Sequence, residues 1–194
     1  GLIGSSDGGN ASGGSSYTWE SSVDGINFST IGGATSPTYD PPPGLMQTTY
    51  FRRIHTSNLT GTPCSAASNV ITVTVNEISP GSIAADQTIC EGSDPLSFSS
   101  VVLASGSGTV SYAWEYSTDS ITWDPTAGTG ATYDHTNITE TTYFRRMATS
   151  LLNGQNCTAS SNALTVTVNE VDGGAINGTQ TVCPGEDPAA LGSA

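Results

Sequence analysis

Apolar and polar residues alternate with a period of two in several short stretches of the chain. The clearest stretch covers residues 70–75, where isoleucine and valine alternate with threonine, and residues 164–168 repeat it. On a β-strand this alternation places the apolar side chains on one face and threonine on a face that tolerates water. Both stretches are therefore predicted to be strands that bury one face.

A tryptophan lies at the centre of two further alternating stretches. Around Trp114 the aromatic residues share one face of the predicted strand, and a glutamate points to the other face. Trp19 stands in the same pattern. We expect Trp19 and Trp114 to be buried in hydrophobic cores, with Tyr50 and Tyr143 as further core residues beside them.

Turn-forming residues follow each tryptophan stretch, at Asp24-Gly25 and at Asp119-Ser120. Phe28 and Trp123 come nine residues after the two tryptophans, where the neighbouring strand of a hairpin is expected. No window carries a 3.6-residue apolar stripe bounded by helix caps, so no long helix is expected. Short strands separated by glycine and proline predict an all-β fold, an antiparallel β-sandwich.

Most of these features occur twice, with an offset of 93 residues between Cys90 and Cys183 and of 95 residues between Trp19 and Trp114. A period of about 93 residues matches one small sandwich domain, so tandem β-sandwich repeats are predicted. The difference between the offsets places extra residues of the first copy in a loop near 41–44, where a shared fold tolerates them. The recurring segments are 17–20 with 112–115, 48–53 with 141–146, 72–77 with 165–170, and 87–90 with 180–183.

The repeat divides the chain into three parts. Residues 1–77 are predicted to form a repeat that lacks its first strand, residues 78–170 a complete repeat, and residues 171–194 the start of a third one. Short linkers near 78–82 and 171–174 are expected to join the repeats into an elongated rod. We expect both chain ends to be cuts within a longer array.

The charged residues narrow the range of partners. The chain has 17 acidic residues, four arginines and no lysine, which gives a formal net charge of -13. Such a surface repels nucleic acid and anionic lipid headgroups, so polyanionic partners are not expected. The sequence contains no apolar run long enough to span a membrane, and direct membrane insertion is not expected.

All four arginines lie in two copies of a Tyr-Phe-Arg-Arg motif, at 50–53 and 143–146. Because neighbouring residues of a strand point to opposite faces, one arginine of each pair is expected to meet the glutamate of the tryptophan strand. The other is expected to pack its stem on an aromatic ring and to reach a loop carbonyl. The alternative interpretation is a binding site for a carboxylate or a sugar.

Residues suited to catalysis or metal binding are few. His55 and His135 stand at non-equivalent positions of the two repeats, and neither has zinc-site spacing or a repeated nucleophile beside it. The sequence has no Asp-x-Asp-x-Asp-Gly calcium loop. The acidic residues near 76–77 and 169–170 have two interpretations, a calcium site assembled from separate loops or solvated surface charge. We expect neither an enzyme nor a cofactor.

The motifs Gln-Thr-Ile-Cys, Tyr-x-Trp-Glu, Ala-Thr-Tyr-Asp, Thr-Thr-Tyr-Phe-Arg-Arg and Thr-Val-Thr-Val-Asn follow one another along the second copy. They lie at 87–90, 112–115, 131–134, 141–146 and 165–169. Their combined order resembles the immunoglobulin-like repeats of very large cell-surface proteins of Bacteroidetes, such as gliding-motility adhesins exported by the type IX system. The resemblance implies immunoglobulin-like sandwiches and an extracellular, cell-surface location, but it implies no particular ligand.

The resemblance also implies that the chain is a repeat segment of an extracellular filament or adhesin, acting as a stalk and in surface adhesion or gliding. Its expected partners are neighbouring repeats of the same chain, other filament subunits or surface glycans. The alternative is an accessory carbohydrate-binding module of a secreted polysaccharide-degrading enzyme, with Trp123 or Phe28 as a sugar platform.

One short motif adds a candidate modification site. Asp119-Ser120-Ile121 resembles the Asp-Ser/Thr-aliphatic sequon for O-glycosylation in these bacteria, which makes Ser120 a candidate acceptor. The competing interpretation is an ordinary hairpin turn, and the first copy has glycine at the equivalent position, Gly25.

Four cysteines without metal-type spacing, in a protein expected to be exported, predict disulfides. Cys90 opens the second repeat and Cys157 precedes its last strand, so they are the one pair within a single complete repeat. We predict a Cys90–Cys157 disulfide, worth about 4 kcal/mol in the chain-entropy model. Cys64 and Cys183 are then unpaired. The rival pairing, Cys64 with Cys90, would clamp two successive repeats.

Overall fold

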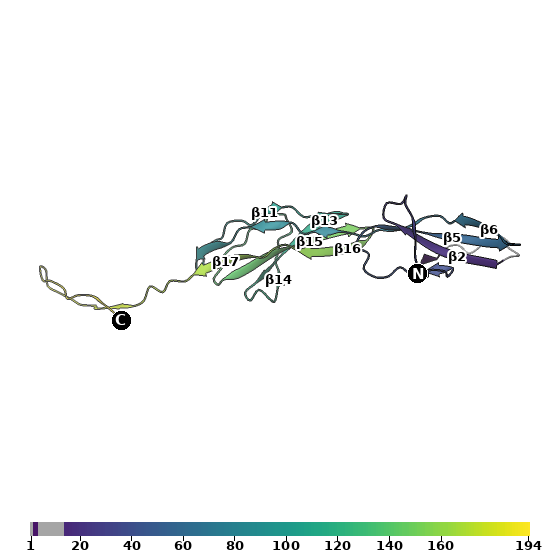
Figure 1. The fold of residues 1–194 in the computed structure, drawn as a ribbon. Helices are drawn as coiled ribbons and strands as arrows, with labels where there is room; N and C mark the ends of the chain where they lie inside the picture. Colours follow the sequence, from purple (N-terminus) through teal and green to yellow (C-terminus); the bar gives the residue numbers. More distant parts are fainter. Residues whose placement is uncertain (1, 4–13) are drawn as a thin grey trace. The chain divides into compact units, whose positions relative to one another are not determined.

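The computed structural model describes residues 2–3 and 14–194, and these residues form β-strands and no helix (Figure 1). The prediction of an all-β fold is confirmed. Internal contacts divide the chain into two compact units, 1–77 and 78–194. The division lies between Glu77 and Ile78, where the repeat pattern also places a boundary.

The strands described in unit 1 are β1 Leu2–Ile3, β2 Gly14–Ser22, β3 Ser29–Thr30, β4 Thr38–Tyr39, β5 Thr49–Leu59, β6 Thr62–Ala67 and β7 Ile71–Val73. The main sheet has the order β3-β2-β5-β6, and β7 pairs with the first residues of β5. β1 pairs with β4 in a separate antiparallel pair. The long strands β2 and β5 therefore form the centre of unit 1.

The strands described in unit 2 are β8 Ile78–Ser79, β9 Ser82–Ala84, β10 Gln87–Cys90, β11 Ser99–Val102, β12 Ser105–Gly106, β13 Thr109–Ser117, β14 Asp124–Pro125, β15 Thr142–Leu152, β16 Gln155–Ser160, β17 Leu164–Asn169, β18 Ile176–Asn177 and β19 Gly192–Ser193. The main sheet has the order β10-β17-β15-β13-β14, and β16 pairs with the later residues of β15. β9 pairs with β11, and β8 with β12.

One strand pair departs from the expected antiparallel arrangement. β10 runs parallel to β17, with Gln87 opposite Val166 and Cys90 opposite Asn169. The two strands are neighbours in the sheet but lie far apart in sequence, so no hairpin forces them to run antiparallel.

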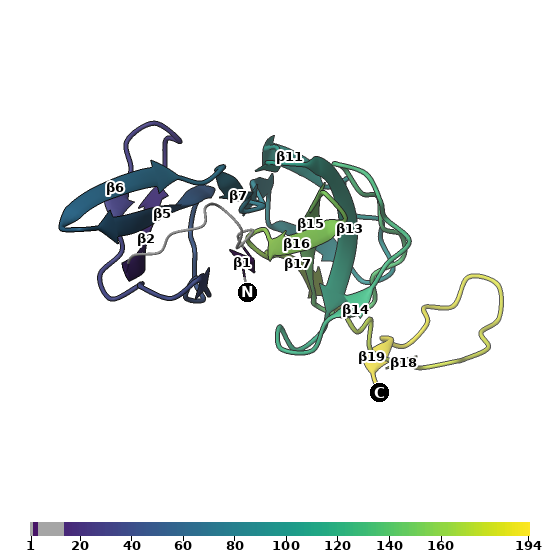
Figure 2. The same cartoon turned by 90° about the vertical axis from the view of Figure 1, so that its right-hand side faces the viewer.

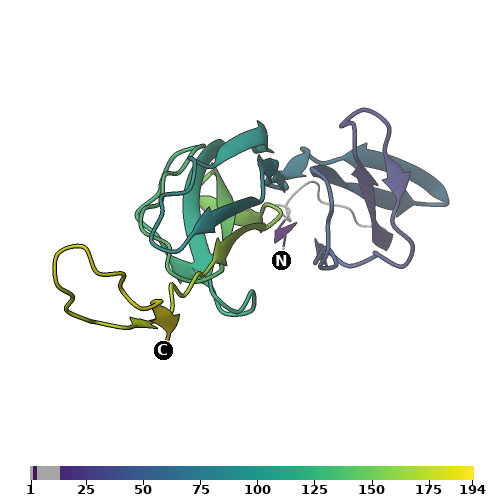
Figure 3. The same cartoon turned by 90° about the vertical axis from the view of Figure 1, so that its left-hand side faces the viewer.

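The core of unit 2 lies between the main sheet and the β9–β11 pair, and Figures 2 and 3 show these strands on either side of it. Phe98 packs against Phe144 of β15 with ring centroids 4.6 Å apart, and against Trp114 of β13 at 5.9 Å. Side chains from both layers thus share one core, as in a β-sandwich. The buried core residues are Ile83, Phe98, Trp114, Ile138, Phe144, Leu164 and Val166.

The aromatic residues of β5 and β15 divide between two faces. Phe51 and Phe144 are 2% and 0% exposed, whereas Tyr50 and Tyr143 are only half-buried. The expectation that the tyrosines are core residues is therefore wrong, and the core residue of each motif is the phenylalanine that follows the tyrosine. Adjacent strand residues point to opposite faces, so the tyrosines lie on the outer face of each sheet. There the ring of Tyr50 packs against the turn at Gly25.

The residues after 170 repeat a local structure of unit 2. β18 pairs with β19 in the same register, 93 residues later, in which β9 pairs with β11. The Gln180 side chain donates to and accepts from the main chain of Ala189, with both distances 2.7 Å. Gln87 holds Leu96 in the same way, at 2.8 Å. All residues from 170 onward are exposed, so this hairpin forms without a core of its own.

Candidate functional site

A glutamate, an arginine and a tryptophan form a stack on the outer face of unit 2. Glu115 of β13 lies directly opposite Arg145 of β15. The Arg145 Nε donates to Oε2 of Glu115 at 2.7 Å, and its guanidinium carbon lies 4.1 Å from the centre of the Trp123 ring. The arginine thus joins two strands and covers one face of the tryptophan, which comes from the loop before β14.

Unit 1 carries the same stack with a different aromatic ring. The Arg52 Nε donates to Oε2 of Glu20 at 2.7 Å, and its guanidinium carbon lies 4.0 Å over Phe28. The prediction that one arginine of each pair meets the glutamate of the tryptophan strand is confirmed in both units. Because phenylalanine replaces tryptophan without changing the geometry, the stack fastens the hairpin loop to the sheet in either unit.

The second arginine of unit 2 is enclosed by backbone carbonyls. Arg146 is 0% exposed. Its Nη1 donates to the Ala131 carbonyl at 2.9 Å and to the Ser100 hydroxyl, and its Nη2 donates to the carbonyls of Pro80 and Val102 at 3.2 and 3.3 Å. These acceptors come from three separate segments of the chain. One side chain therefore ties the first strands of unit 2 to its central loop.

Burial lowers the pKa of Arg146, and the nearby Tyr112 hydroxyl partly opposes this shift. The guanidinium carbon lies 4.7 Å from the centre of the Tyr112 ring. Backbone carbonyl dipoles supply the negative charge that a carboxylate would otherwise provide. In unit 1 Arg53 donates to the Pro37 carbonyl at 2.7 Å and lies 4.6 Å over Tyr17, as predicted for the second arginine of each pair.

We call Arg146 and Arg53 the inner arginines and Arg145 and Arg52 the outer arginines. The loop whose carbonyl accepts from each inner arginine also accepts a hydrogen bond from the buried tryptophan. The indole N–H of Trp114 donates to the Gly130 carbonyl at 2.9 Å, and that of Trp19 donates to the Ser36 carbonyl at 3.0 Å. Both indoles are buried, with 1% of Trp19 and 0% of Trp114 exposed. Each tryptophan therefore packs in the core with its ring and holds the loop with its indole N–H.

The turn after β13 is organised by a carboxylate. Asp119 accepts hydrogen bonds from the backbone N–H groups of Thr122 and Ile121 at 2.7 and 2.8 Å and from the Ser117 hydroxyl at 2.9 Å. These hydrogen bonds, with Thr122 first, lower the pKa of Asp119 to about 2. The turn holds Ile121 with 82% of its surface exposed.

Unit 1 builds the same turn around Asp24, which accepts from the hydroxyl of Ser22 and the backbone of Asn27. These hydrogen bonds hold the pKa of Asp24 well below its usual value. Gly25 and Ser120 occupy the position after the aspartate with φ of 72° and 59°. The two units therefore share the turn conformation and not the hydroxyl. Ser120 is exposed, and its glycosylation stays a prediction.

The two histidines have unrelated surroundings. His135 lies half-buried with its ring 5.0 Å from that of Phe144 and its Nδ1 3.0 Å from the Tyr133 hydroxyl. Burial lowers the pKa of His135, and the charge of Asp94 partly opposes this shift. Sequence patterns gave no sign of this packing, since no counterpart histidine exists in the other repeat.

His55 of unit 1 stacks on Tyr17, with ring centroids 5.0 Å apart, and its Nε2 lies 2.6 Å from the Ser15 hydroxyl. This serine and histidine come from opposing strands and are far apart in sequence, so their contact was not predicted. Across the part of the chain that the structure describes, no three metal-binding side chains come together. The calcium site assembled from loops stays a hypothesis.

The four cysteines are free thiols. Cys90 lies opposite Asn169 at the end of β17, and Cys157 lies opposite Ser150 on β15. Eight residues along β15 and three along β17 separate these two levels, so at 3.3 Å per residue the cysteines lie about 35 Å apart. The predicted Cys90–Cys157 disulfide is wrong, because a disulfide needs Cα atoms within about 7 Å.

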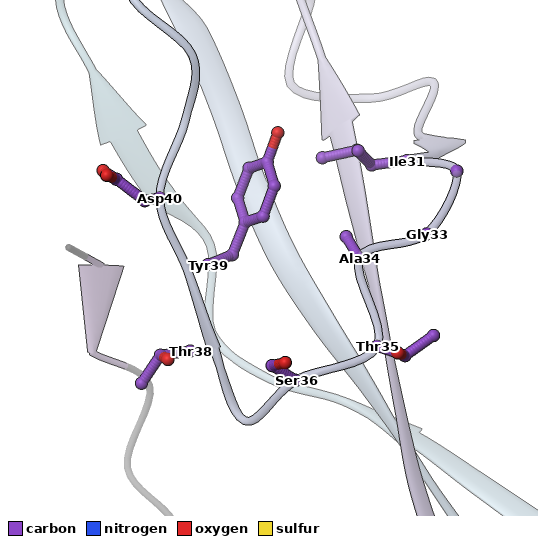
Figure 4. A pocket seen from close by; sticks show the side chains of 9 residues that line it. Ile31, Gly33, Ala34, Thr35, Ser36, Thr38, Tyr39 and Asp40 are labelled. Carbon is purple, nitrogen blue, oxygen red and sulfur yellow. The ribbon is translucent and has the colours of Figure 1, made fainter.

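One open pocket of about 290 Å³ lies in unit 1, formed by residues 31–36 and 38–40 (Figure 4). The ring of Tyr39 stands on one side of it, and Ile31 and Ala34 stand on the other. The same loop carries the Ser36 carbonyl that the Trp19 indole bonds. The pocket is therefore a hollow beside a structural loop, and it contains neither histidine nor cysteine.

A family model described as "Domain of unknown function (DUF8696)" matches the chain twice, over residues 4–77 and 79–170. Neither the curated proteins nor the solved structures include a match to the chain. Among the described residues, no helix is long and apolar enough to cross a membrane.

Proposed function

We propose, because the chain belongs to the DUF8696 family of domains of unknown function and carries two copies of that domain, that each copy is a structural repeat of an extracellular filament or adhesin. In this proposal the repeats form a stalk, contribute to surface adhesion or gliding, and have no catalytic role. Their partners are neighbouring repeats, other filament subunits or surface glycans.

The observation that carries the proposal is that the recurring polar residues are used to hold the fold. The outer arginine bonds its glutamate at 2.7 Å in both units and lies 4.0 and 4.1 Å over its aromatic ring. The inner arginine, the tryptophan indole and the turn aspartate also make the same kinds of contact in both units. Recurring residues that hold the fold of each repeat fit a stalk built from stacked repeats.

The strand order supports an immunoglobulin-like type for each repeat. In such domains three adjacent strands form one sheet, a fourth extends it, and a buried tryptophan lies on the third strand. The order β17-β15-β13-β14 in unit 2, with Trp114 on β13, fits this description. The packing of Phe98 on Phe144, 4.6 Å apart, would then occupy the place of the inter-sheet disulfide of antibody domains.

Surface labelling of intact source cells tests the proposed location. Antibodies raised against the full chain should label unpermeabilised cells, and brief external proteolysis should remove the signal. An antibody against a cytoplasmic protein is the control and should label only after permeabilisation. Labelling of the chain only after permeabilisation would contradict an extracellular filament.

The alternative function is a carbohydrate-binding module, for which Trp123 is the favoured platform. Arg145 covers one face of this half-buried ring, so a bound sugar would have to stack on the other face. A glycan array with the full chain distinguishes the two functions. Saturable binding that Trp123→Ala abolishes and Phe28→Ala leaves unchanged would establish a sugar site, whereas a stalk repeat should show no binding above background.

A further inference from the structure

We propose that two copies of this chain pair side by side through the open edge of β16, with the two β16 strands antiparallel and Thr158 of one copy opposite Thr158 of the other. The contact continues the main sheet of unit 2 from one copy into the next. The inference names the surface through which other subunits of the proposed filament would bind, so it rests on the proposed function.

The outer edge of β16 is a part of the main sheet that no described strand covers. β15 pairs with β13 on one side, and with β17 and β16 on the other. β10 covers the outer edge of β17, whereas β16 pairs with β15 alone among the described strands. A strand at a sheet edge presents unpaired backbone groups to a further strand. The chemistry of this edge therefore selects a partner that offers an extended strand.

The turn before β16 determines which of its backbone groups point outward. Asn153 and Gly154 have φ of 50° and 79°, which is typical of the two-residue type I′ turn. The pair of residues that flanks such a turn exchanges hydrogen bonds, and beyond it every second pair does so. The backbone N–H and C=O groups of Asn156, Thr158 and Ser160 therefore point away from β15. All three residues are exposed.

A comparison with unit 1 supports this orientation. Pro63 of β6 lies opposite Asn58 of β5, and 93 residues later Asn156 lies opposite Leu151. Proline has no backbone N–H, so it fits an edge strand where that group would point outward. Proline at an edge also hinders the addition of a further strand. The edge of β6 thus carries a protection that the edge of β16 lacks.

The distribution of charge favours a second copy of the chain at this edge. A net charge of -13 opposes self-association of the chain as a whole. No acidic residue lies between Glu140 and Glu170, however, and β16 itself carries no charged side chain. Two β16 strands can therefore meet without placing like charges opposite each other, which is destabilising in a sheet.

Antiparallel pairing about a twofold axis satisfies the outward groups of both copies. With the two Thr158 residues opposite each other, Asn156 of each copy lies opposite Ser160 of the other. This register uses every outward group and forms about six backbone hydrogen bonds. Threonine opposite threonine is also a favourable cross-strand pair. The contact is small, so we expect a weak, reversible dimer.

Sedimentation velocity at rising protein concentration, up to about 1 mM, tests the pairing. Dithiothreitol keeps the four thiols reduced, so that any dimer is non-covalent. The chain should form dimers. Asn156→Pro should raise the dissociation constant about tenfold or more, because each copy loses one outward donor. Asn156→Ala keeps the backbone donor and is the matched control, which should pair as the original chain does.

A second variant keeps the test independent of any effect of proline on the fold. Thr158→Glu places like charges opposite each other at the centre of the contact and should also raise the dissociation constant. Circular dichroism should be unchanged for each variant, since Thr158 is exposed and unit 1 accommodates Pro63 at the position of Asn156.

Hydrogen exchange locates the contact. The amides of Asn156, Thr158 and Ser160 should gain protection as the concentration rises, whereas that of Cys157, which faces β15, should not change. A chain that stays monomeric throughout the series, or a dimer that neither variant weakens, would overturn the pairing. So would protection that appears along β6 instead. Each of these outcomes leaves the proposed stalk function standing, because surface labelling tests that function separately.

Discussion

The two arginines of the Tyr-Phe-Arg-Arg motif in unit 2 differ in what surrounds them. Arg146 is fully buried and satisfies acceptors from three segments, whereas Arg145 bonds one partly exposed glutamate. Removing a buried cation leaves several carbonyls without donors, and removing a surface ion pair costs little. The stability lost on removing an arginine therefore depends on which face of the strand it occupies, although the residue type is the same.

We expect Arg146→Ala to lower the free energy of unfolding of unit 2 by about 3 kcal/mol or more, because the carbonyls of Ala131, Pro80 and Val102 lose their donor. Arg145→Ala should lower it by less than about 1 kcal/mol. Urea unfolding followed by tryptophan fluorescence measures both. Equal losses for the two variants would contradict the assignment of Arg146 as the structural clamp.

His135 predicts a pH dependence of unit 2. Burial disfavours its charged form, so its folded-state pKa lies below 6.5 and the unfolded chain binds the proton more readily. The stability from the neutral imidazole is complete above pH 6.5 and decreases as the pH falls through the folded-state value. Unfolding midpoints from pH 8 to 5 should show this decline, and His135→Gln should remove most of it.

At the scale of the elements, hairpins and turns were predictable because they depend on residues close in sequence. The aspartate turns and the tryptophan strands lie where the alternation placed them, and the Glu115–Arg145 contact follows from two neighbouring strands. Sequence alone could not tell which of Tyr143 and Phe144 faces the core, since either parity fits an alternating strand. The strand that pairs with β10 depends on the order of the whole sheet. The distance between Cys90 and Cys157 therefore could not be predicted from the sequence.

The turn after each tryptophan strand provides a reciprocal test. Ser120 adopts a φ of 59°, which a residue with a Cβ atom adopts at a cost of about 1 kcal/mol, while glycine adopts it freely. Ser120→Gly should therefore stabilise unit 2 by up to about 1 kcal/mol, and Gly25→Ser should destabilise unit 1 by a similar amount. Thermal unfolding of the two variants gives the signs. The same sign for both would refute a shared turn conformation.

At the scale of the whole molecule, folded core and matched family domain end at the same place. The second family match ends at residue 170, and every residue from there onward is exposed. Residues 171–194 form a hairpin that contributes no side chain to the core of unit 2.

Deletion of residues 171–194 should leave the unfolding free energy of unit 2 unchanged within about 0.5 kcal/mol, the usual effect of surface changes. Hydrogen exchange provides the second measurement. Amides of β18 and β19 should exchange rapidly, while those of β13 and β15 stay protected. A lowered midpoint for the shortened chain would show that the hairpin packs on unit 2.

The placement of the arginines also determines how the molecule meets digestive enzymes. Trypsin-like proteases cut after lysine or arginine, and this chain offers them only Arg52, Arg53, Arg145 and Arg146. All four lie inside the central strands β5 and β15, and none lies in a loop or between the units. Cleavage requires a locally unfolded segment. Each unit of this chain therefore presents trypsin with no target until its central strands open, and the lifetime of the chain under trypsin should follow the stability of the single units.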